Sequence, residues 1–274
     1  MPKETFVPFG PEPTAPERTV TRETRKDKDD SDSDSDPLEI KTYDVSASKI
    51  PVNQFMKENI IPRHPFRCLL SGGSGSGKTM LCLNLLKRKN FFKNYFDVIF
   101  LFSPTAGKDE TQQLLEIPMS NTCSDLDGEG PTHLEFIFGV QQAEIEKNGI
   151  SNSDKILIIF DDIISSIKFL NSPIYKQVLI QGRHSNISSI TLTQKLNSIP
   201  RTLRLQMTDL FFFPSSNSEV ERVVAEFTPP GSTKKQFQKL VSAATDQQYS
   251  FLYINVRSPV SKRFRKNLNI YLKV

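Results

Sequence analysis

The sequence is poor in the features that mark secreted and membrane proteins. Its 274 residues include three cysteines and no C-x-x-C pair. No apolar run approaches the roughly 18 residues that a membrane helix needs, and the amino terminus has no signal-peptide core. Two of the cysteines, Cys68 and Cys82, fall in predicted core elements, where a reduced thiol acts as a small hydrophobic group. We therefore expect a soluble intracellular protein without a membrane span.

Charge is distributed unevenly along the chain. Residues 1–49 contain 8 Lys/Arg and 12 Asp/Glu, residues 50–232 contain 18 of each, and residues 233–274 contain 9 and 1. The first segment is also rich in proline and serine and has few apolar residues to offset the entropy of ordering. We predict a disordered acidic tail over 1–49, followed by a domain over 50–274 with a basic C-terminal segment.

A glycine-rich segment carries the strongest chemical signal. It fills the pattern G-x-x-x-x-G-K-[ST] with Gly72, Gly73, Ser74, Gly75, Ser76, Gly77, Lys78 and Thr79. The apolar run 66–71 predicts a buried strand before it, and the run 80–86 predicts a buried helix after it. This context favours a phosphate-binding loop over a chance match in a flexible linker. We expect Lys78 to contact the β- and γ-phosphates of ATP and the Thr79 hydroxyl to bind Mg²⁺.

Two carboxylates follow about 80 residues later. The apolar run 156–160 predicts a strand buried on both faces of a parallel sheet, and Asp161 and Asp162 stand at its carboxyl end. A turn-forming Asp pair would look the same in isolation. After a phosphate loop, the pattern instead predicts that Asp161 orients the Mg²⁺ shell and Asp162 polarises the attacking water. The three histidines have no carboxylate or cysteine partner at ligand spacing, so no metal other than Mg²⁺ is supported.

Strands and helices are expected to alternate along the rest of the chain. Strands are predicted at 97–102, 187–193, 209–213 and 249–256, and helices near 110–115, 140–147, 173–182 and around Phe237. Ser218 and Glu221 have the spacing of a capping box that starts another helix. This alternation predicts an α/β domain with a mainly parallel sheet flanked by helices.

A resemblance to a known family emerges from these motifs. The segments that carry it are Gly72–Thr79, Ile156–Asp162, Gly182-Arg183-His184, the strand ending at Gln194, and Ile199-Pro200 with Arg204. Together they resemble the poxvirus-type genome-packaging ATPases, the viral branch of the FtsK–HerA superfamily that includes virophages and Maverick/Polinton elements. The resemblance implies a P-loop, RecA-like (ASCE) fold and a homo-oligomeric ring around double-stranded DNA. It also implies ATP-driven loading of a preformed capsid, with capsid-vertex or other virion proteins as partners. The host cytoplasm or virus factory is the implied location, with the nucleus and the virion as alternatives.

The resemblance also implies roles for individual residues. Gln194 would sense the γ-phosphate, and an arginine would reach the ATP of the neighbouring subunit. Arg183 is the first choice for this arginine, followed by Arg204 and Arg201; the competing interpretation is that Arg183 caps a helix. The wider superfamily often has Glu where Asp162 stands, and the chain lacks the membrane-anchored part of FtsK and the barrel of HerA.

Three functions compete on this basis. The first is a DNA-packaging motor, the second is a HerA-like DNA-processing helicase or translocase, and the third is a nucleotide switch or small-molecule kinase. The sequence has no N-K-x-D motif and no Arg-rich lid segment, which argues against the third. The basic end, including the run 262–266, contacts DNA phosphates, docks on an acidic capsid surface, or is simply a solvated strand and tail.

Overall fold

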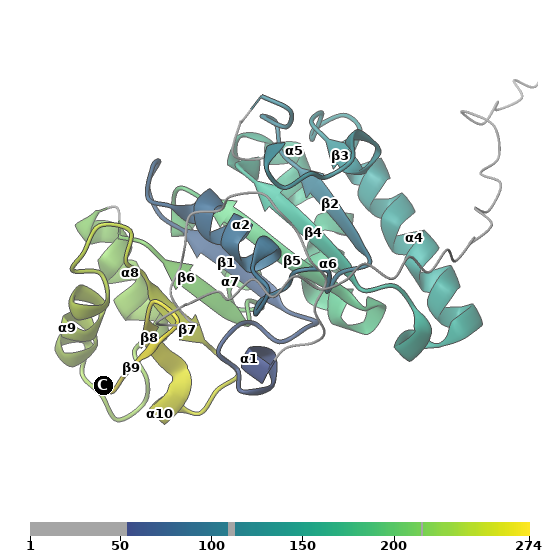
Figure 1. Cartoon of the computed structure of the whole chain (residues 1–274). Helices are drawn as coiled ribbons and strands as arrows, with labels where there is room; N and C mark the ends of the chain where they lie inside the picture. The colour runs from purple at the N-terminus through teal and green to yellow at the C-terminus, as the bar shows by residue number, and fades with distance from the viewer. Residues whose placement is uncertain (1–53, 109–112, 215) are drawn as a thin grey trace, which may run out of the picture. The chain divides into compact units, whose positions relative to one another are not determined.

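A mainly parallel β-sheet forms the centre of the computed structural model, which describes residues 54–108, 113–214 and 216–274 (Figure 1). In this described part, the strand order is β3-β2-β4-β5-β1-β6-β7-β8-β9. The strands are β1 Arg67–Ser71, β2 Val98–Phe102, β3 Thr122–Cys123, β4 Ile156–Asp161, β5 Ile187–Thr193, β6 Asp209–Phe212, β7 Leu252–Asn255, β8 Phe264–Lys266 and β9 Ile270–Leu272. Neighbours from β3 to β6 are parallel, whereas β7, β8 and β9 pair antiparallel.

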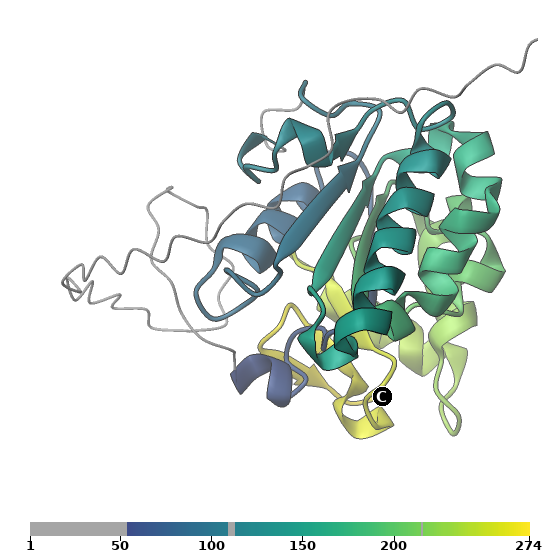
Figure 2. The same cartoon turned by 90° about the vertical axis from the view of Figure 1, so that its right-hand side faces the viewer.

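Helices cover both faces of the sheet. Their bounds are α1 Gln54–Lys57, α2 Lys78–Lys87, α4 Gly130–Asn148, α5 Ile167–Asn171, α6 Pro173–Gln181, α7 Arg201–Arg204, α8 Asn217–Phe227, α9 Lys234–Ala244 and α10 Val260–Arg263. One core layer joins the sheet to α4–α9, and the other joins it to α1 and α2. Figure 2 shows α2 on one side of the strands and the green helices on the other.

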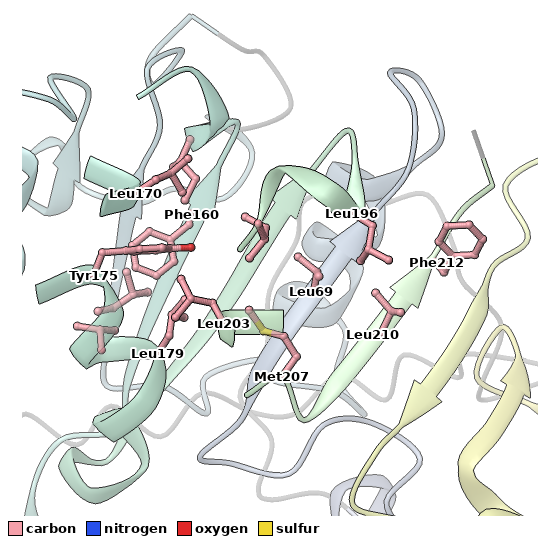
Figure 3. Packing of buried hydrophobic residues seen from close by; sticks show 14 of the residues in the cluster. Leu69, Phe160, Leu170, Tyr175, Leu179, Leu196, Leu203, Met207, Leu210 and Phe212 are labelled. Atoms are coloured by element: carbon pink, nitrogen blue, oxygen red, sulfur yellow. The ribbon is translucent and has the colours of Figure 1, made fainter. Parts of the chain in front are cut away.

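Alternating side chains of the central strands feed the two core layers. In β4, Ile158 and Phe160 point into the layer under α6, whereas Leu157 and Ile159 point into the layer under α2. Figure 3 shows the first layer, where Tyr175 of α6 meets Phe160 at a ring-centroid distance of 5.1 Å. A strand buried on both faces needs the continuous apolar run that the sequence shows.

Several boundary predictions are corrected by the structure. The helix predicted near 140–147 begins earlier, at Gly130. The N-cap of α8 is Ser216, which accepts from the Glu219 N–H at 3.4 Å, so the Ser218–Glu221 assignment is wrong by two residues. A full capping box instead joins Thr233 and Gln236 at the start of α9. The predicted tail over 1–49, the domain start at residue 50, and residues 110–112 of the predicted 110–115 helix lie outside the described residues.

The basic C-terminal segment is partly buried in the fold, which contradicts its interpretation as a fully solvated strand and tail. Arg265 in β8 is 1% exposed and donates to the carbonyls of Asn59 and Ile60 and to the Tyr271 hydroxyl. Lys266 bonds the Asp246 carboxylate. Both side chains are therefore committed within the fold. Among the helices that the structure describes, none has both the length and the apolar character that crossing a bilayer requires.

Candidate functional site

The glycine-rich segment connects β1 to α2 in a tightly packed turn. A Cβ on Gly72 would lie 2.6 Å from Cβ of Phe213, the residue after β6, so no larger side chain fits there. Gly77 has φ +100°, a backbone conformation that favours glycine. The Gly72 N–H donates to the Thr193 carbonyl at 3.1 Å, which ties the loop to the end of β5. The predicted strand, loop and helix are all found.

Lys78 folds back over this loop from the first turn of α2. Its Nζ donates to the carbonyl oxygens of Gly72 at 2.7 Å and Gly73 at 2.8 Å. Partial burial lowers the pKa of Lys78, while the carboxylates of Asp161 and Asp162 act in the opposite direction. A half-buried ammonium group held by two carbonyls is a ready partner for a phosphate oxygen.

The two predicted carboxylates stand at the carboxyl end of β4. Asp162 has φ 51° and ψ 34°, in the left-handed region that Asp tolerates better than most residues. It begins the 3-10 turn η3, Ile163–Ser165, so it also fits the turn-forming interpretation. Gln194 Nε2 donates to Asp162 Oδ1 at 3.5 Å, a long hydrogen bond between exposed groups. Gln194 reaches this carboxylate because β5 lies directly beside β4.

These elements meet in a pocket of about 480 Å³ at the carboxyl edge of the sheet. Its volume is within the usual range for small-molecule sites. The lining residues are Ser74, Gly75, Lys78, Thr79, Thr105, Lys108, Asp161, Asp162, Leu192, Thr193 and Gln194. The structure thus brings together residues from the phosphate loop, the acidic pair and the predicted sensor. It does so because β5, which Gln194 directly follows, lies between β1 and β4.

Two pocket residues were missed by the sequence reasoning. Thr105 and Lys108 come from the turn after β2, which lies beside β4 on the side away from β5. Hydrogen bonds shape this turn, with Lys108 N–H donating to the Thr105 carbonyl at 3.0 Å. The available signal was Ser103-Pro104 at the end of a predicted parallel strand, because the carboxyl ends of such strands gather at one edge.

The comparison with known families agrees with this geometry. The family described as Poxvirus A32 protein matches residues 52–261. The chain belongs to this family. DNA packaging protein OPG160 of Variola virus is 29% identical over 221 residues, covering 76% of this chain and 74% of that protein. The OPG160 protein of Monkeypox virus is 28% identical over 233 residues, covering 80% of this chain and 71% of that protein.

Solved structures support the fold of the A32 family member. The DNA-packaging ATPase B204 from Sulfolobus turreted icosahedral virus has a TM-score of 0.52 at 15% identity, covering 77% of this chain and 98% of that chain. B204 from Sulfolobus turreted icosahedral virus 2 in complex with AMP gives a TM-score of 0.51 at 15% identity, covering 76% and 98%. The predicted P-loop, RecA-like fold and the resemblance to poxvirus-type packaging ATPases are confirmed.

The donor set of the A32 pocket fits Mg²⁺. The Thr79 hydroxyl and the Asp161 carboxylate, both hard oxygen donors, line the same cavity. Mg²⁺ in nucleotide sites is commonly held by one or two protein oxygens, substrate phosphates and water. The part of the chain that the structure describes holds no group of three His, Cys, Asp or Glu residues suited to a metal. The residues present therefore match a nucleotide-completed site rather than an all-protein cage.

The three candidate arginines of this A32 protein differ sharply in environment. Arg204 is 7% exposed, forms an ion pair with Glu226 and donates to the carbonyls of Leu196 and Ile199, so it is an internal brace. Arg201 is exposed at the start of α7. Arg183 is exposed in η4, Gly182–Ser185, and donates to His184 Nε2 at 3.0 Å. Since η4 precedes β5, Arg183 lies at the opposite edge from its own pocket.

Proposed function

We propose that this chain is a Mg²⁺-dependent ATPase that drives double-stranded DNA into a preformed viral capsid. The observation that carries the proposal is the pocket in which Lys78, Asp161, Asp162 and Gln194 converge. The names of the relatives support the cellular task, because OPG160 is called a DNA packaging protein. Virion proteins are the further partners that this task requires.

Nucleotide binding follows from the chemistry of the phosphate loop. The loop N–H groups and the α2 N-terminus bind phosphate oxygens, and Lys78 exchanges its bonds to the Gly72 and Gly73 carbonyls for the β- and γ-phosphates. Thr79 and Asp161 would hold Mg²⁺, which would supply positive charge to the phosphates. The hydrolytic step then needs a group that orients water.

Asp162 and Gln194 supply the groups beside the γ-phosphate. Asp162 is the carboxylate that accepts a proton from the attacking water, and its neighbour Asp161 is committed to the metal. The Gln194 amide donates to Asp162 when no phosphate competes for it. A bound γ-phosphate offers this amide a better acceptor, so Gln194 changes partner between nucleotide states.

A ring of subunits would complete the site. Arg183 lies at the edge opposite its own pocket, so it can serve only the nucleotide of another subunit. A head-to-tail interface places unlike edges of neighbouring subunits in contact and closes into a ring. An arginine supplied in this way is worth about 10³–10⁵ in turnover in other phosphoryl-transfer proteins.

The test measures ATP hydrolysis with and without double-stranded DNA. We expect DNA to stimulate the parent protein, and we expect Lys78→Ala and Arg183→Ala to be inactive alone. Mixing the two variants restores interfaces that join an intact phosphate loop to an intact arginine, so activity should partly return. Arg201→Ala in place of Arg183→Ala is the matched control and should retain activity alone. A DNA-independent monomer would overturn the motor, and failure of recovery in confirmed rings would overturn the role of Arg183.

A further inference from the structure

Positively charged side chains gather at the amino edge of the sheet, opposite the nucleotide pocket. We call this the basic edge and define it as Arg63, Arg67, Arg257, Lys262 and Arg263. Arg183 lies at the same edge but is kept apart, because it is assigned to the nucleotide of the neighbouring subunit. Arg63 and Arg67 lead into β1, Arg183 precedes β5, and Arg257 follows β7, whose antiparallel pairing puts Asn255 beside Asp209. Lys262 and Arg263 belong to α10, which begins three residues after Arg257 and is drawn at the bottom of Figure 1.

Backbone carbonyls at the strand ends hold this arrangement together. Arg257 donates through Nη1 to the Arg63 carbonyl at 3.0 Å and through Nη2 to the Pro65 carbonyl at 2.6 Å. Arg67 donates to the Gln206 carbonyl at 2.6 Å, and Arg263 donates to the Ser258 carbonyl at 3.2 Å. Neutral carbonyls satisfy the guanidinium donors but leave their charge uncompensated.

The positive charges outnumber the acids around them. In the described part of the chain, Arg63, Arg67, Arg183 and Arg257 form no ion pair with any described carboxylate. The carboxylate beneath them, Asp209, is 1% exposed and accepts from the Tyr253 hydroxyl at 2.7 Å and the Thr208 hydroxyl at 2.6 Å. Burial and, after it, the charges of Arg257 and Arg183 lower the pKa of Arg67 to about 10, while the Asp209 carboxylate acts in the opposite direction.

The other half of the amino edge lacks this excess. At the start of β4, the Lys155 ammonium pairs with the Asp97 carboxylate at 3.4 Å, and the Lys155 N–H donates to the same carboxylate at 2.8 Å. The charge there is balanced locally. The excess positive charge therefore lies on the side formed by β5, β1, β6 and β7, and the exposed members of the basic edge are Arg63, Arg257 and Lys262.

We propose that the basic edge is the surface on which this protein contacts the phosphates of double-stranded DNA. Exposed arginines along neighbouring strand ends, spaced by roughly 4.8 Å per strand, present a row of donors. A DNA duplex presents one negative charge per roughly 1.7 Å of its axis, so it can engage several of them at once. The basic edge recognises backbone charge and shape, and it lies away from the pocket, so DNA and nucleotide do not compete for the same cations.

This proposal rests on the proposed motor function but is tested by binding. Arg63→Gln and Lys262→Gln remove exposed charges and leave the carbonyl of residue 63, which Arg257 binds, in place. Lys168→Gln is the matched control, because Lys168 is an exposed cation in α5, which follows β4 at the other edge. Arg183 stays unchanged since it is assigned to the neighbouring nucleotide.

The full-length chain and each variant are titrated with a fluorescent double-stranded oligonucleotide at several salt concentrations. Each lost phosphate contact should weaken binding roughly eightfold at 0.1 M salt and reduce the log–log salt slope by about 0.9. Binding should fall equally for unrelated DNA sequences, and Lys168→Gln should match the parent. Unchanged affinity and slope in the Arg63→Gln, Lys262→Gln double variant would overturn the proposal.

Two further readouts separate the alternatives. A peptide of residues 27–36, which carries six Asp and one Lys, is titrated in parallel. If the double variant no longer binds this peptide but still binds DNA, the basic edge docks an acidic protein segment and the DNA proposal is wrong.

The second readout is ATP hydrolysis without DNA, which should have the same rate in the parent and the double variant. Loss of DNA binding in a protein with no ATPase activity would support the surface and count against the proposed hydrolase.

Discussion

The two edges of the central sheet are both polar, but they are built in opposite ways. At the carboxyl edge, Lys78, Asp162 and Gln194 line a cavity and are joined by few bonds, one of them as long as 3.5 Å. At the amino edge, Arg67, Arg257 and Asp209 are each held by short bonds to strand ends or hydroxyls. Lys78 is held by the carbonyls of its own loop at 2.7 and 2.8 Å, whereas Asp162 and Gln194 share only the long bond. The polar groups of the carboxyl edge therefore face a cavity that can take a ligand, whereas Arg67 and Asp209 at the amino edge join strand ends and Arg257 also stays exposed.

The sharpest contrast within the carboxyl edge is between its adjacent carboxylates. Asp162→Asn should bind ATP as the parent does but hydrolyse it on the order of 10²–10⁴ times more slowly, because only the proton acceptor is lost. Asp161→Asn should instead raise the Mg²⁺ concentration needed for half-maximal hydrolysis. Nucleotide binding and steady-state turnover over a Mg²⁺ series distinguish the two. Parent-like turnover in Asp162→Asn would remove that residue from catalysis.

A substitution at the amino edge should change the stability of the fold rather than the rate of turnover. His64 joins the start of β1 to β5, with Nδ1 2.6 Å from Ser188 Oγ and Nε2 2.7 Å from Asn186 Oδ1. The Asn186 amide oxygen can only accept, so Nε2 carries the proton of that bond, and the Ser188 hydroxyl, which also accepts from the Phe66 N–H, can donate to Nδ1 of the neutral ring. Burial lowers the pKa of His64 from 6.5 to about 4.

A lowered histidine pKa costs stability on acidification. The unfolded chain takes up this proton near pH 6.5 and the folded chain only near pH 4, so stability falls as the pH drops through that window, by roughly 3 kcal/mol at its end. His64→Gln should be less stable than the parent at pH 7 yet lose this part of the pH dependence. Urea unfolding from pH 7 to 4 measures the difference, with His133→Gln, an exposed histidine, as control. Parallel pH profiles for parent and His64→Gln would contradict the assignment.

Lys108 offers the smallest expected effect and tests the part of the pocket that sequence reasoning missed. Its side chain lines the pocket from the turn after β2, so its charge can stabilise the phosphates. Lys108→Ala should lower turnover roughly tenfold to a hundredfold, less than a rigid donor would cost. Lys108→Arg should retain most activity, and Lys89→Ala, an exposed lysine after α2, should have no effect. Equal turnover in Lys108→Ala and the parent would exclude Lys108 from the site.

The predictable features were those with local causes. The phosphate loop, β4 and β5 have motifs or continuous apolar runs that fix their structure, and the carboxyl-edge rule then brings Asp161, Asp162 and Gln194 together. The burial of Arg265 could not be inferred from a run of charges, because its partners are the carbonyls of Asn59 and Ile60, about 200 positions earlier in the chain. The position of Lys108 in the pocket could not be predicted either, because it depends on how the turn after β2 packs in the folded protein.

The tight contact at Gly72 has a mechanical consequence. Because Gly72 touches Phe213 with no room for another atom, the phosphate loop cannot shift without displacing the end of β6. The Phe213 ring rests on Phe251 at a centroid distance of 5.1 Å, and Phe251 leads directly into β7. That strand runs antiparallel to β6, with Leu252 beside Phe212 and Asn255 beside Asp209, and ends two residues before Arg257. Packed side chains and one short strand therefore connect the phosphate loop to the arginines at the amino edge.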